Sequence, residues 1–216
     1  MYIEAKKSIK RNFLRLRDVT NIMRYGPKAP KYAELIWVRP QDIHHAVYSN
    51  SKFITTICSG CVTSINKFFI FKKFYNEPHI NACIEHWVNG IPWEDTKDFI
   101  TMLNAIKRGK FWVGCKTEVE LRQRYLKLDQ MFRQAKYSKR LKTRKELDPN
   151  TFREEGGILI CIGENGEPLI FDGYHRLSIS LILDLPIIPA QLGCVDISAI
   201  ESLEKYRMPP NSESIS

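Results

Sequence analysis

The chain has 216 residues, of which 44% are hydrophobic and 26% charged, and its formal net charge is +9. This composition is typical of a folded globular protein whose core needs no disulfide or metal staples. The charge is unevenly placed, because residues 1–31 carry a local +7 and residues 121–147 a local +8. Such basic segments could meet nucleic acid, an anionic membrane face or a phosphorylated ligand, or they could be solvated helix faces.

The sequence gives no sign of export or of membrane insertion. The basic N-terminus is not followed by the apolar run of a signal peptide. The longest uncharged stretch, residues 53–66, falls short of the roughly 20 apolar residues that a membrane span needs. The six cysteines are therefore expected to be reduced thiols. We expect a cytoplasmic protein without a membrane span.

In the first half of the chain the pattern predicts three segments. Residues 1–32 form a basic N-terminal segment with apolar residues at helical spacing up to Tyr25, where Gly26 and Pro27 end the helix. An apolar run within residues 33–43 predicts the first strand of the core. Residues 44–110 are predicted to be a helical insertion or subdomain. Within it, residues 53–87 are assigned to helices, and a further helix begins near residue 94 and ends at residues 107–110.

The second half, residues 111–207, predicts a compact domain followed by a disordered tail over residues 208–216. Thr117 and Glu120 form a capping-box signature, which predicts a helix to about residue 135. Apolar runs over 158–162 and 168–171 flank Asn165-Gly166 and predict a β-hairpin closed by a type I′ turn. A helix over 174–183, a strand over 187–192 and a last helix over 197–206 complete the domain.

The turn between the hairpin and the next helix holds the residues best suited to chemistry. Asp172 and Gly173 lead from a strand into a helix whose first turn contains His175 and Arg176. A helix start favours an anion, and glycine allows the backbone to approach it closely. Arg176 could grip a phosphate with two hydrogen bonds, and His175 could donate another or move a proton. Asp172 could be an N-cap, a magnesium ligand or a base. The alternative is that Asp172 only caps the helix and Arg176 pairs with a surface carboxylate.

The stretch Phe171-Asp172-Gly173-Tyr174-His175-Arg176, with the hairpin before it and Ile-Pro-Ala-Gln-Leu after its helix, resembles the ParB/sulfiredoxin superfamily. Sulfiredoxins have Phe-Gly-Gly-Cys-His-Arg at this turn, free-serine kinases have Asp-Gly-His-Thr-Arg, and ParB proteins have a Gly-Glu-Arg-Arg type of turn. The resemblance covers roughly residues 112–200, with residues 35–40 similar to the opening strand of these families. It implies an α+β fold with a small mixed sheet and flanking helices, joined to a mainly helical, basic N-terminal region.

The resemblance also implies a site. Nucleotide phosphates would be bound by Gly173, Tyr174, His175 and Arg176, and Asp172 and His175 would be catalytic. Tyr174 stands where sulfiredoxins have their reactive cysteine, and a phenol cannot replace a thiolate there, so we do not expect sulfiredoxin activity. The kinase-like Asp172 implies ATP or another nucleotide with Mg²⁺, which Asp172 could bind. The implied reaction is phosphoryl transfer to a small hydroxyl-bearing acceptor, which depends on positioning more than on covalent chemistry.

Other residues are candidates for supporting roles. Additional positive charge could come from Arg39, Arg122 and Arg153, and the general base could be Glu34, Glu118 or Glu154. Two other functions stay open. A ParB-like nucleic-acid-binding protein would use the basic segments, although no helix-turn-helix pattern follows residue 190. A non-catalytic interaction protein would retain only the fold.

One cysteine motif has metal-ligand spacing. Cys58 and Cys61 are separated by two residues, as in many zinc sites. A lone pair of this kind needs two more ligands, which only Cys83 with His79 or His86 could supply. We therefore predict no metal site at this motif.

Overall fold

The computed structural model describes residues 2–49, 59–110 and 114–209. The chain divides into two compact units. One, which we call the sheet unit, comprises Met1–Lys73, Lys142–Gly173 and Pro186–Ser216. The other, which we call the helical unit, comprises Phe74–Leu141 and Tyr174–Leu185. The helical unit is therefore built from two separate stretches of chain.

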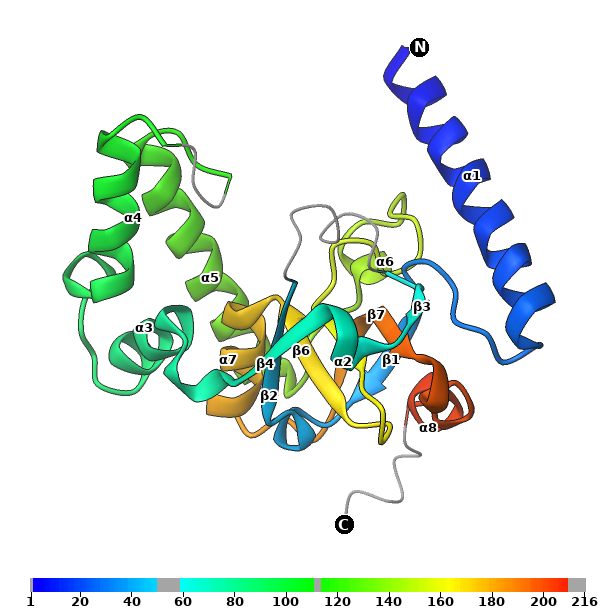
Figure 1. Ribbon diagram of the computed structural model, residues 1–216. Helices are drawn as coiled ribbons and strands as arrows, with labels where there is room; N and C mark the ends of the chain where they lie inside the picture. The colour runs from blue at the N-terminus through cyan, green and yellow to red at the C-terminus, as the bar shows by residue number, and fades with distance from the viewer. Residues whose placement is uncertain (1, 50–58, 111–113, 210–216) are drawn as a thin grey trace. The chain divides into compact units, whose positions relative to one another are not determined.

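The strands of the described residues all belong to the sheet unit. They are β1 Leu35–Val38, β2 His45–Ser49, β3 Val62–Thr63, β4 Phe69–Lys73, β5 Leu159–Ile162, β6 Pro168–Asp172 and β7 Ile188–Asp196. They form one sheet in the order β1-β7-β5-β6-β2-β4, and β3 also pairs with β7 (Figure 1). The sheet is mixed, since β2 runs parallel to β6 and β5 parallel to β7, whereas β5 and β6 are antiparallel. The prediction of helices combined with a mixed sheet is thus confirmed.

Strand β7 organises this sheet. All nine of its residues are buried, and it pairs with β1, β3 and β5. Its run of mainly apolar residues is typical of a strand covered on both faces. The core around it includes Cys161, Leu169 and Cys194.

The helices of the sheet unit are α1 Tyr2–Tyr25, α2 Ile65–Phe68, α6 Arg144–Leu147 and α8 Glu204–Arg207. Helix α1 docks through Leu14, which packs with Tyr32, Ala33 and Phe152. It ends where predicted, at Gly26, whose φ of +85° lies in the left-handed region. Within the described ranges, no helix combines the length and the apolar character needed to cross a bilayer.

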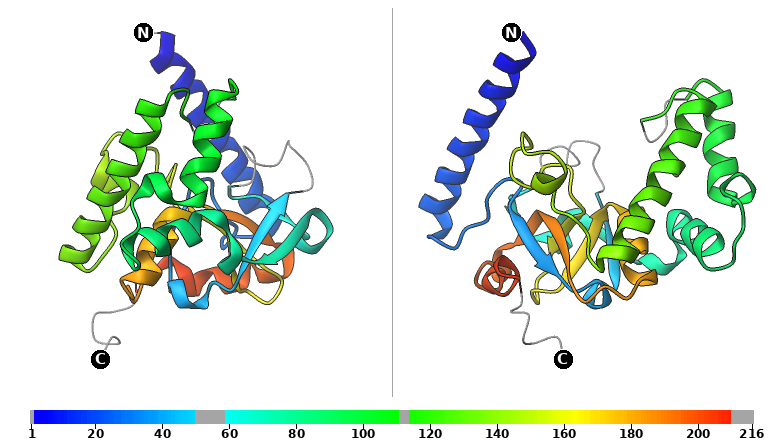
Figure 2. Two further views of the ribbon diagram at one scale, coloured as in Figure 1. Left: turned by 90° about the vertical axis from the view of Figure 1, so that its left-hand side faces the viewer. Right: turned by 180° about the vertical axis from the view of Figure 1, so that it is seen from behind.

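The helical unit consists of α3 Pro78–Trp87, α4 Lys97–Lys107, α5 Glu118–Ser138 and α7 Tyr174–Ile182 (Figures 1 and 2). The predicted capping box is confirmed, because the Thr117 side chain accepts from the Glu120 N–H and the Glu120 side chain reaches back. Trp93, Phe99, Leu121 and Tyr125 are buried in its core. The N–H groups of Trp87 and Trp93 both donate to Asp129, so hydrogen bonds fix the buried ring of Trp93 and the partly buried ring of Trp87.

Three predictions of local structure need correction. Residues 53–87 are not all helical, because 62–63 and 69–73 are strands; residues 50–58 lie outside the described residues. The β5–β6 hairpin does not have a type I′ turn: Gly166 N–H bonds to Gly163 O, and of the Asn165-Gly166 pair only Gly166 has a positive φ. The last predicted helix is broken into short 3₁₀ turns before α8.

Candidate functional site

The starts of three helices meet in the helical unit. His79, Asp98 and His175 are each the second residue of a helix, of α3, α4 and α7 respectively. Nδ1 of His79 is 2.8 Å from Oδ2 of Asp98, and the ring centroids of His79 and His175 are 4.9 Å apart. One possible ligand atom from each residue lies within 4.8 Å of the others. We call these three residues the His–Asp–His cluster.

The carboxylate of Asp98 anchors the cluster. Asp98 is buried, and Oδ2 accepts hydrogen bonds from Tyr125 Oη at 3.1 Å and from His79. Burial, followed by the nearby Asp98 charge, raises the pKa of Tyr125, so the phenol keeps its proton and donates it. The start of α4 is itself fixed, since the Thr96 side chain accepts from the Phe99 N–H. The position of Asp98 is therefore set by local capping and by a buried hydrogen bond.

The imidazole of His175 is the unusual member. It is 7% exposed and packs edge-on against Tyr125, yet its Nε2 has no hydrogen-bond partner among the described residues. Burial, together with the charges of His79 and Arg124, lowers the pKa of His175 to about 3, so its ring is neutral at pH 7. A buried polar atom without a partner costs about 1–3 kcal/mol, and most proteins avoid it.

A pocket gives access to part of the cluster. His79 and Asp98 line a cavity of about 390 Å³ between α3 and α4, together with the charged residues Glu77, Glu85 and Lys97. The His79 side chain is 26% exposed there. This arrangement is compatible with three kinds of chemistry. The helix starts could stabilise an anion, and His79 could move a proton while Asp98 orients its ring. The three side chains could also supply nitrogen and oxygen ligands to a metal ion.

The turn predicted to carry the chemistry spans the boundary of the two units. Asp172 and Gly173 end the second of the three chain segments of the sheet unit, and Tyr174, His175 and Arg176 begin α7 in the helical unit. Gly173 has a φ of +96°, as expected for a position that requires glycine. Its N–H donates to Oδ1 of Asp172 at 2.7 Å. Asp172 is exposed, and Tyr174 and Arg176 are half-buried.

Of the three accessory arginines, Arg39 and Arg153 belong to the sheet unit and Arg122 to the helical unit. Arg39 is exposed next to the short 3₁₀ turn Pro40–Asp42 of the sheet unit. Arg122 pairs with Glu94 and Glu118 on the surface of the helical unit. Arg153, in the sheet unit, pairs with the buried Asp18 at 2.6 Å.

Each candidate general base has a structural partner. Glu34 pairs with Arg207 at 2.8 Å and accepts the Lys31 N–H. Glu118 belongs to the surface pair with Arg122 described above. Glu154 is buried, and both of its carboxylate oxygens accept the backbone N–H of Arg144 at 3.0 Å. These contacts account for the three carboxylates without a catalytic role.

The residues between Cys58 and Cys61 attach α1 to the sheet. Ser59 Oγ accepts the Ala33 N–H and donates to Leu192 O, and Gly60 N–H bonds to Gly193 O at 2.8 Å. Asn21 of α1 donates to Gly60 O at 2.8 Å. This packing explains Ser59 and Gly60 without a metal. Cys58 lies outside the described residues, and Cys61 belongs to the sheet unit whereas Cys83 belongs to the helical unit.

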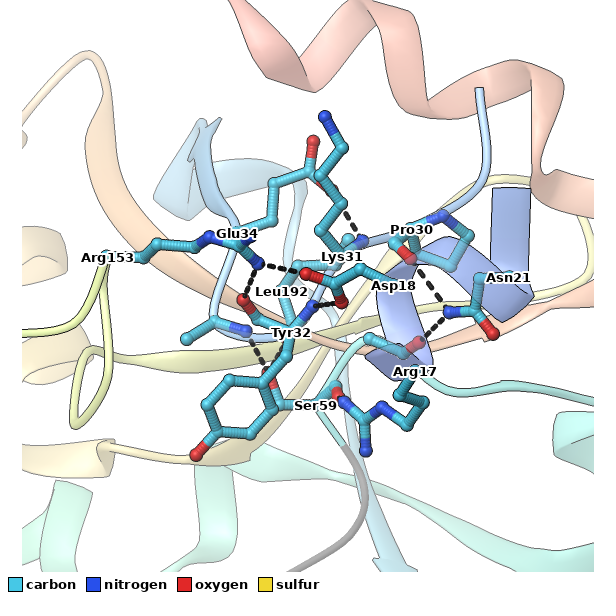
Figure 3. Close-up of polar contacts among 12 residues, drawn as sticks. Arg17, Asp18, Asn21, Pro30, Lys31, Tyr32, Glu34, Ser59, Arg153 and Leu192 are labelled. Atoms are coloured by element: carbon cyan, nitrogen blue, oxygen red, sulfur yellow. Dashed lines mark hydrogen bonds and ion pairs between the residues drawn. The ribbon is translucent and has the colours of Figure 1, made fainter. Parts of the chain in front are cut away.

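Asp18 is the second anchor of α1. Its Oδ1 accepts the Tyr32 N–H at 2.7 Å and its Oδ2 accepts from Arg153 at 2.6 Å (Figure 3). Arg153 also donates to Tyr32 O at 2.7 Å. The carboxylate is only 7% exposed, so this ion pair is shielded from water on the side of Asp18.

A basic groove lies beside α1 in the sheet unit. It has a volume of about 1190 Å³ and runs along α1 and residues 144–155. Five cationic side chains line it: Arg11, Arg15, Arg144, Lys145 and Arg153. Only two acidic residues, Asp148 and Glu155, face the same groove. It is a concave surface with an excess of positive charge.

Sequence reasoning missed most of the His–Asp–His cluster. It named His79 only as a possible partner for cysteines, and Asp98 was indistinguishable from an ordinary acidic residue in the first turn of a helix. No local sequence signal joins the three residues, because His79 and Asp98 are 19 residues apart and His175 comes from a separate stretch of chain. No protein-family model, no curated protein and no solved structure matches this chain.

Proposed function

We propose that the protein binds a nucleotide in its helical unit and transfers a phosphoryl group from it to a small hydroxyl-bearing molecule, in the manner of kinases of the ParB/sulfiredoxin type. The observation that carries this proposal is the meeting of the starts of α3, α4 and α7 at the His–Asp–His cluster. Each helix start presents N–H groups and the positive end of a dipole, so a phosphate there would be stabilised by several helices at once.

The side chains at this place suit phosphoryl transfer. The reaction mainly requires positioning and positive charge against the transferred group. Helix α7 has no acidic residue in its first turn, which instead contains Arg176. The Arg176 guanidinium could add two parallel hydrogen bonds to a phosphate bound at this helix start. ATP with Mg²⁺ is the expected nucleotide, and Asp172 as the magnesium ligand stays a prediction of the resemblance.

Replacing Arg176 with alanine should weaken nucleotide binding about 10- to 100-fold, since a hydrogen bond to a charged group contributes about 1.5–3 kcal/mol. The measurement is calorimetric titration with ATP, ADP and CTP in the presence of Mg²⁺. Arg133→Ala, an exposed arginine on α5 of the same unit, is the control and should leave affinity unchanged. Wild-type protein that binds none of the three nucleotides would exclude the proposal, and binding without turnover would favour a non-catalytic role.

The basic groove of the sheet unit favours a second candidate, binding of nucleic acid through its phosphates. Cations in a groove release counterions from nucleic acid, which makes such binding strongly salt-dependent. We expect fluorescence anisotropy with a labelled oligonucleotide to show affinity that falls with salt, and Arg15→Ala and Lys145→Ala each to reduce the log–log slope by about 1. Arg39→Ala, an exposed cation outside the groove, should not change it. Negligible binding at low salt would remove this candidate.

A further inference from the structure

We propose that the His–Asp–His cluster binds one divalent transition-metal ion, with a ring nitrogen from His79, a ring nitrogen from His175 and a carboxylate oxygen from Asp98 as its protein ligands. The catalytic meaning of this ion rests on the proposed function, because it would lie where the phosphate is expected. Metal binding itself is a separate property that can be measured without a nucleotide.

The distances within the cluster are close to those of a coordination sphere. Metal–nitrogen and metal–oxygen bonds of this kind are about 2.0–2.2 Å, so two neighbouring ligand atoms are about 2.8–3.6 Å apart and two opposite ones about 4.2 Å. His79 Nδ1 and Asp98 Oδ2 are 2.8 Å apart, and the three ligand atoms all lie within 4.8 Å of one another. If side-chain rotation moved each ligand atom by less than about 1 Å, all three atoms would lie at bonding distance from one ion.

The unpartnered nitrogen of His175 is an independent reason to expect a ligand. His175 is more than nine-tenths buried, and its Nε2 bonds to no described residue. A metal ion would give this nitrogen a strong partner, and buried imidazole nitrogens are common metal ligands. A purely structural histidine at this position would be expected to reach a backbone carbonyl or a hydroxyl.

The same unit contains a structural His–Asp pair for comparison. His86 Nε2 is 3.2 Å from Asp129 Oδ1, and His86 Nδ1 is 2.7 Å from Ile91 O. Asp129 also accepts the N–H groups of Trp87 and Trp93. Both ring nitrogens of His86 therefore have protein partners, and the pair is complete without an ion. The His–Asp–His cluster lacks this completeness.

The donor set selects the kind of ion. Two imidazoles and one carboxylate favour Zn²⁺, Co²⁺ or Fe²⁺, whereas Mg²⁺ and Ca²⁺ prefer oxygen ligands alone. With three protein ligands, positions on the ion remain for water or for a phosphate oxygen. Such an ion would place positive charge against a phosphoryl group.

The electrostatics predict that metal and phosphate assist one another. Three helix starts disfavour an isolated cation, and the single charge of Asp98 only partly offsets them. A phosphate bound beside the ion supplies negative charge that both the ion and the helix starts favour. Because such coupling is reciprocal, a nucleotide should increase the metal affinity by the same factor by which metal increases nucleotide affinity.

The test uses the full-length chain after removal of metals with a chelator, titrated calorimetrically with Zn²⁺. We expect one equivalent to bind to wild type, and affinity to fall at least about 100-fold in His175→Ala and in Asp98→Asn. His86→Gln is the matched control, because it removes a half-buried histidine beside a carboxylate in the same unit and should bind Zn²⁺ like wild type. Wild type without stoichiometric binding, or cluster variants that bind as tightly as wild type, would overturn the proposal.

A second measurement uses wild type alone, because a variant that fails to fold would lose Zn²⁺ binding whether or not the substituted residue is a ligand. The chain has five histidines, at positions 44, 45, 79, 86 and 175. In ¹H–¹⁵N spectra of the imidazole rings, Zn²⁺ should shift the signals of His79 and His175 and leave the other three in place; any other pattern contradicts the assignment. Zn²⁺ binding with no nucleotide binding would retain the metal site and exclude the proposed function, and the reverse result would exclude only the metal site.

Discussion

Replacing Gly60 with alanine should destabilise the sheet unit by about 3 kcal/mol or more. Gly60 has a φ of +70°, and a Cβ at this position would lie 2.6 Å from the backbone carbonyl of Lys31 and 2.7 Å from the backbone nitrogen of Tyr32. These are backbone atoms, which cannot rotate away as the end of a side chain can. The surrounding turn is also fixed by Ser59, so relief of the clash would break the attachment of α1.

Gly26→Ala separates the two causes of this effect. Gly26 has a φ of +85° in the same unit, but nothing lies within 4 Å of the position of its Cβ. Gly26→Ala should therefore lower the free energy of unfolding by only about 1–2 kcal/mol, which is the cost of placing an alanine in the left-handed conformation. The comparison is made by urea denaturation of both variants and of wild type. If the two variants lost equal stability, Gly60 could not lie as close to the backbone of Lys31 and Tyr32 as it does in the structure.

The second large effect is expected at Asp18. Asp18→Ala should cost about 3–5 kcal/mol, because it removes the buried carboxylate that accepts the Tyr32 N–H and neutralises the charge of Arg153. The loss should release α1 from the sheet unit before the rest unfolds. Hydrogen exchange of α1 amides, together with the denaturation midpoint, would measure both consequences.

Glu201→Ala is the control for Asp18→Ala. Glu201 also forms an ion pair within the sheet unit, with Lys28, but both side chains are largely exposed. Solvent screens such pairs, so its removal should hardly change stability. If the two variants behave alike, the Asp18–Arg153 pair contributes no more than a surface contact, and α1 is held mainly by Leu14 and its apolar neighbours.

Features encoded by neighbouring residues could be predicted from the sequence. The capping box at Thr117 and Glu120, the hairpin of β5 and β6 and the start of α7 after Gly173 all depend on residues a few positions apart. The strand at residues 69–71 could not be predicted in this way, because a short aromatic run is compatible with either a helix or a strand. Its strand conformation is set by pairing with β2, over 20 residues earlier in the chain.

The candidate site depended on packing that no local pattern reveals. His79 and Asp98 are 19 residues apart and His175 comes from the second stretch of the helical unit, so only the packing of α3, α4 and α7 brings them together. Sequence reasoning did find His175, through the resemblance and the turn that precedes it. The phosphate contact of His175 stays a prediction, and the structure shows its ring buried against Tyr125 and His79.

The late place of β7 in the sequence affects how the sheet can form while the chain is being synthesised. This strand is the most extensively paired of the described strands, yet it is the last of them in the order of the sequence. Strand β1 leaves the ribosome about 150 residues before β7, its partner in the sheet, and must wait for it. A nascent chain that stalls before Ile188 would expose the edges of β1 and β5 to other chains. We therefore expect truncated products of this protein to require chaperones or to aggregate, even where the helical unit is already complete.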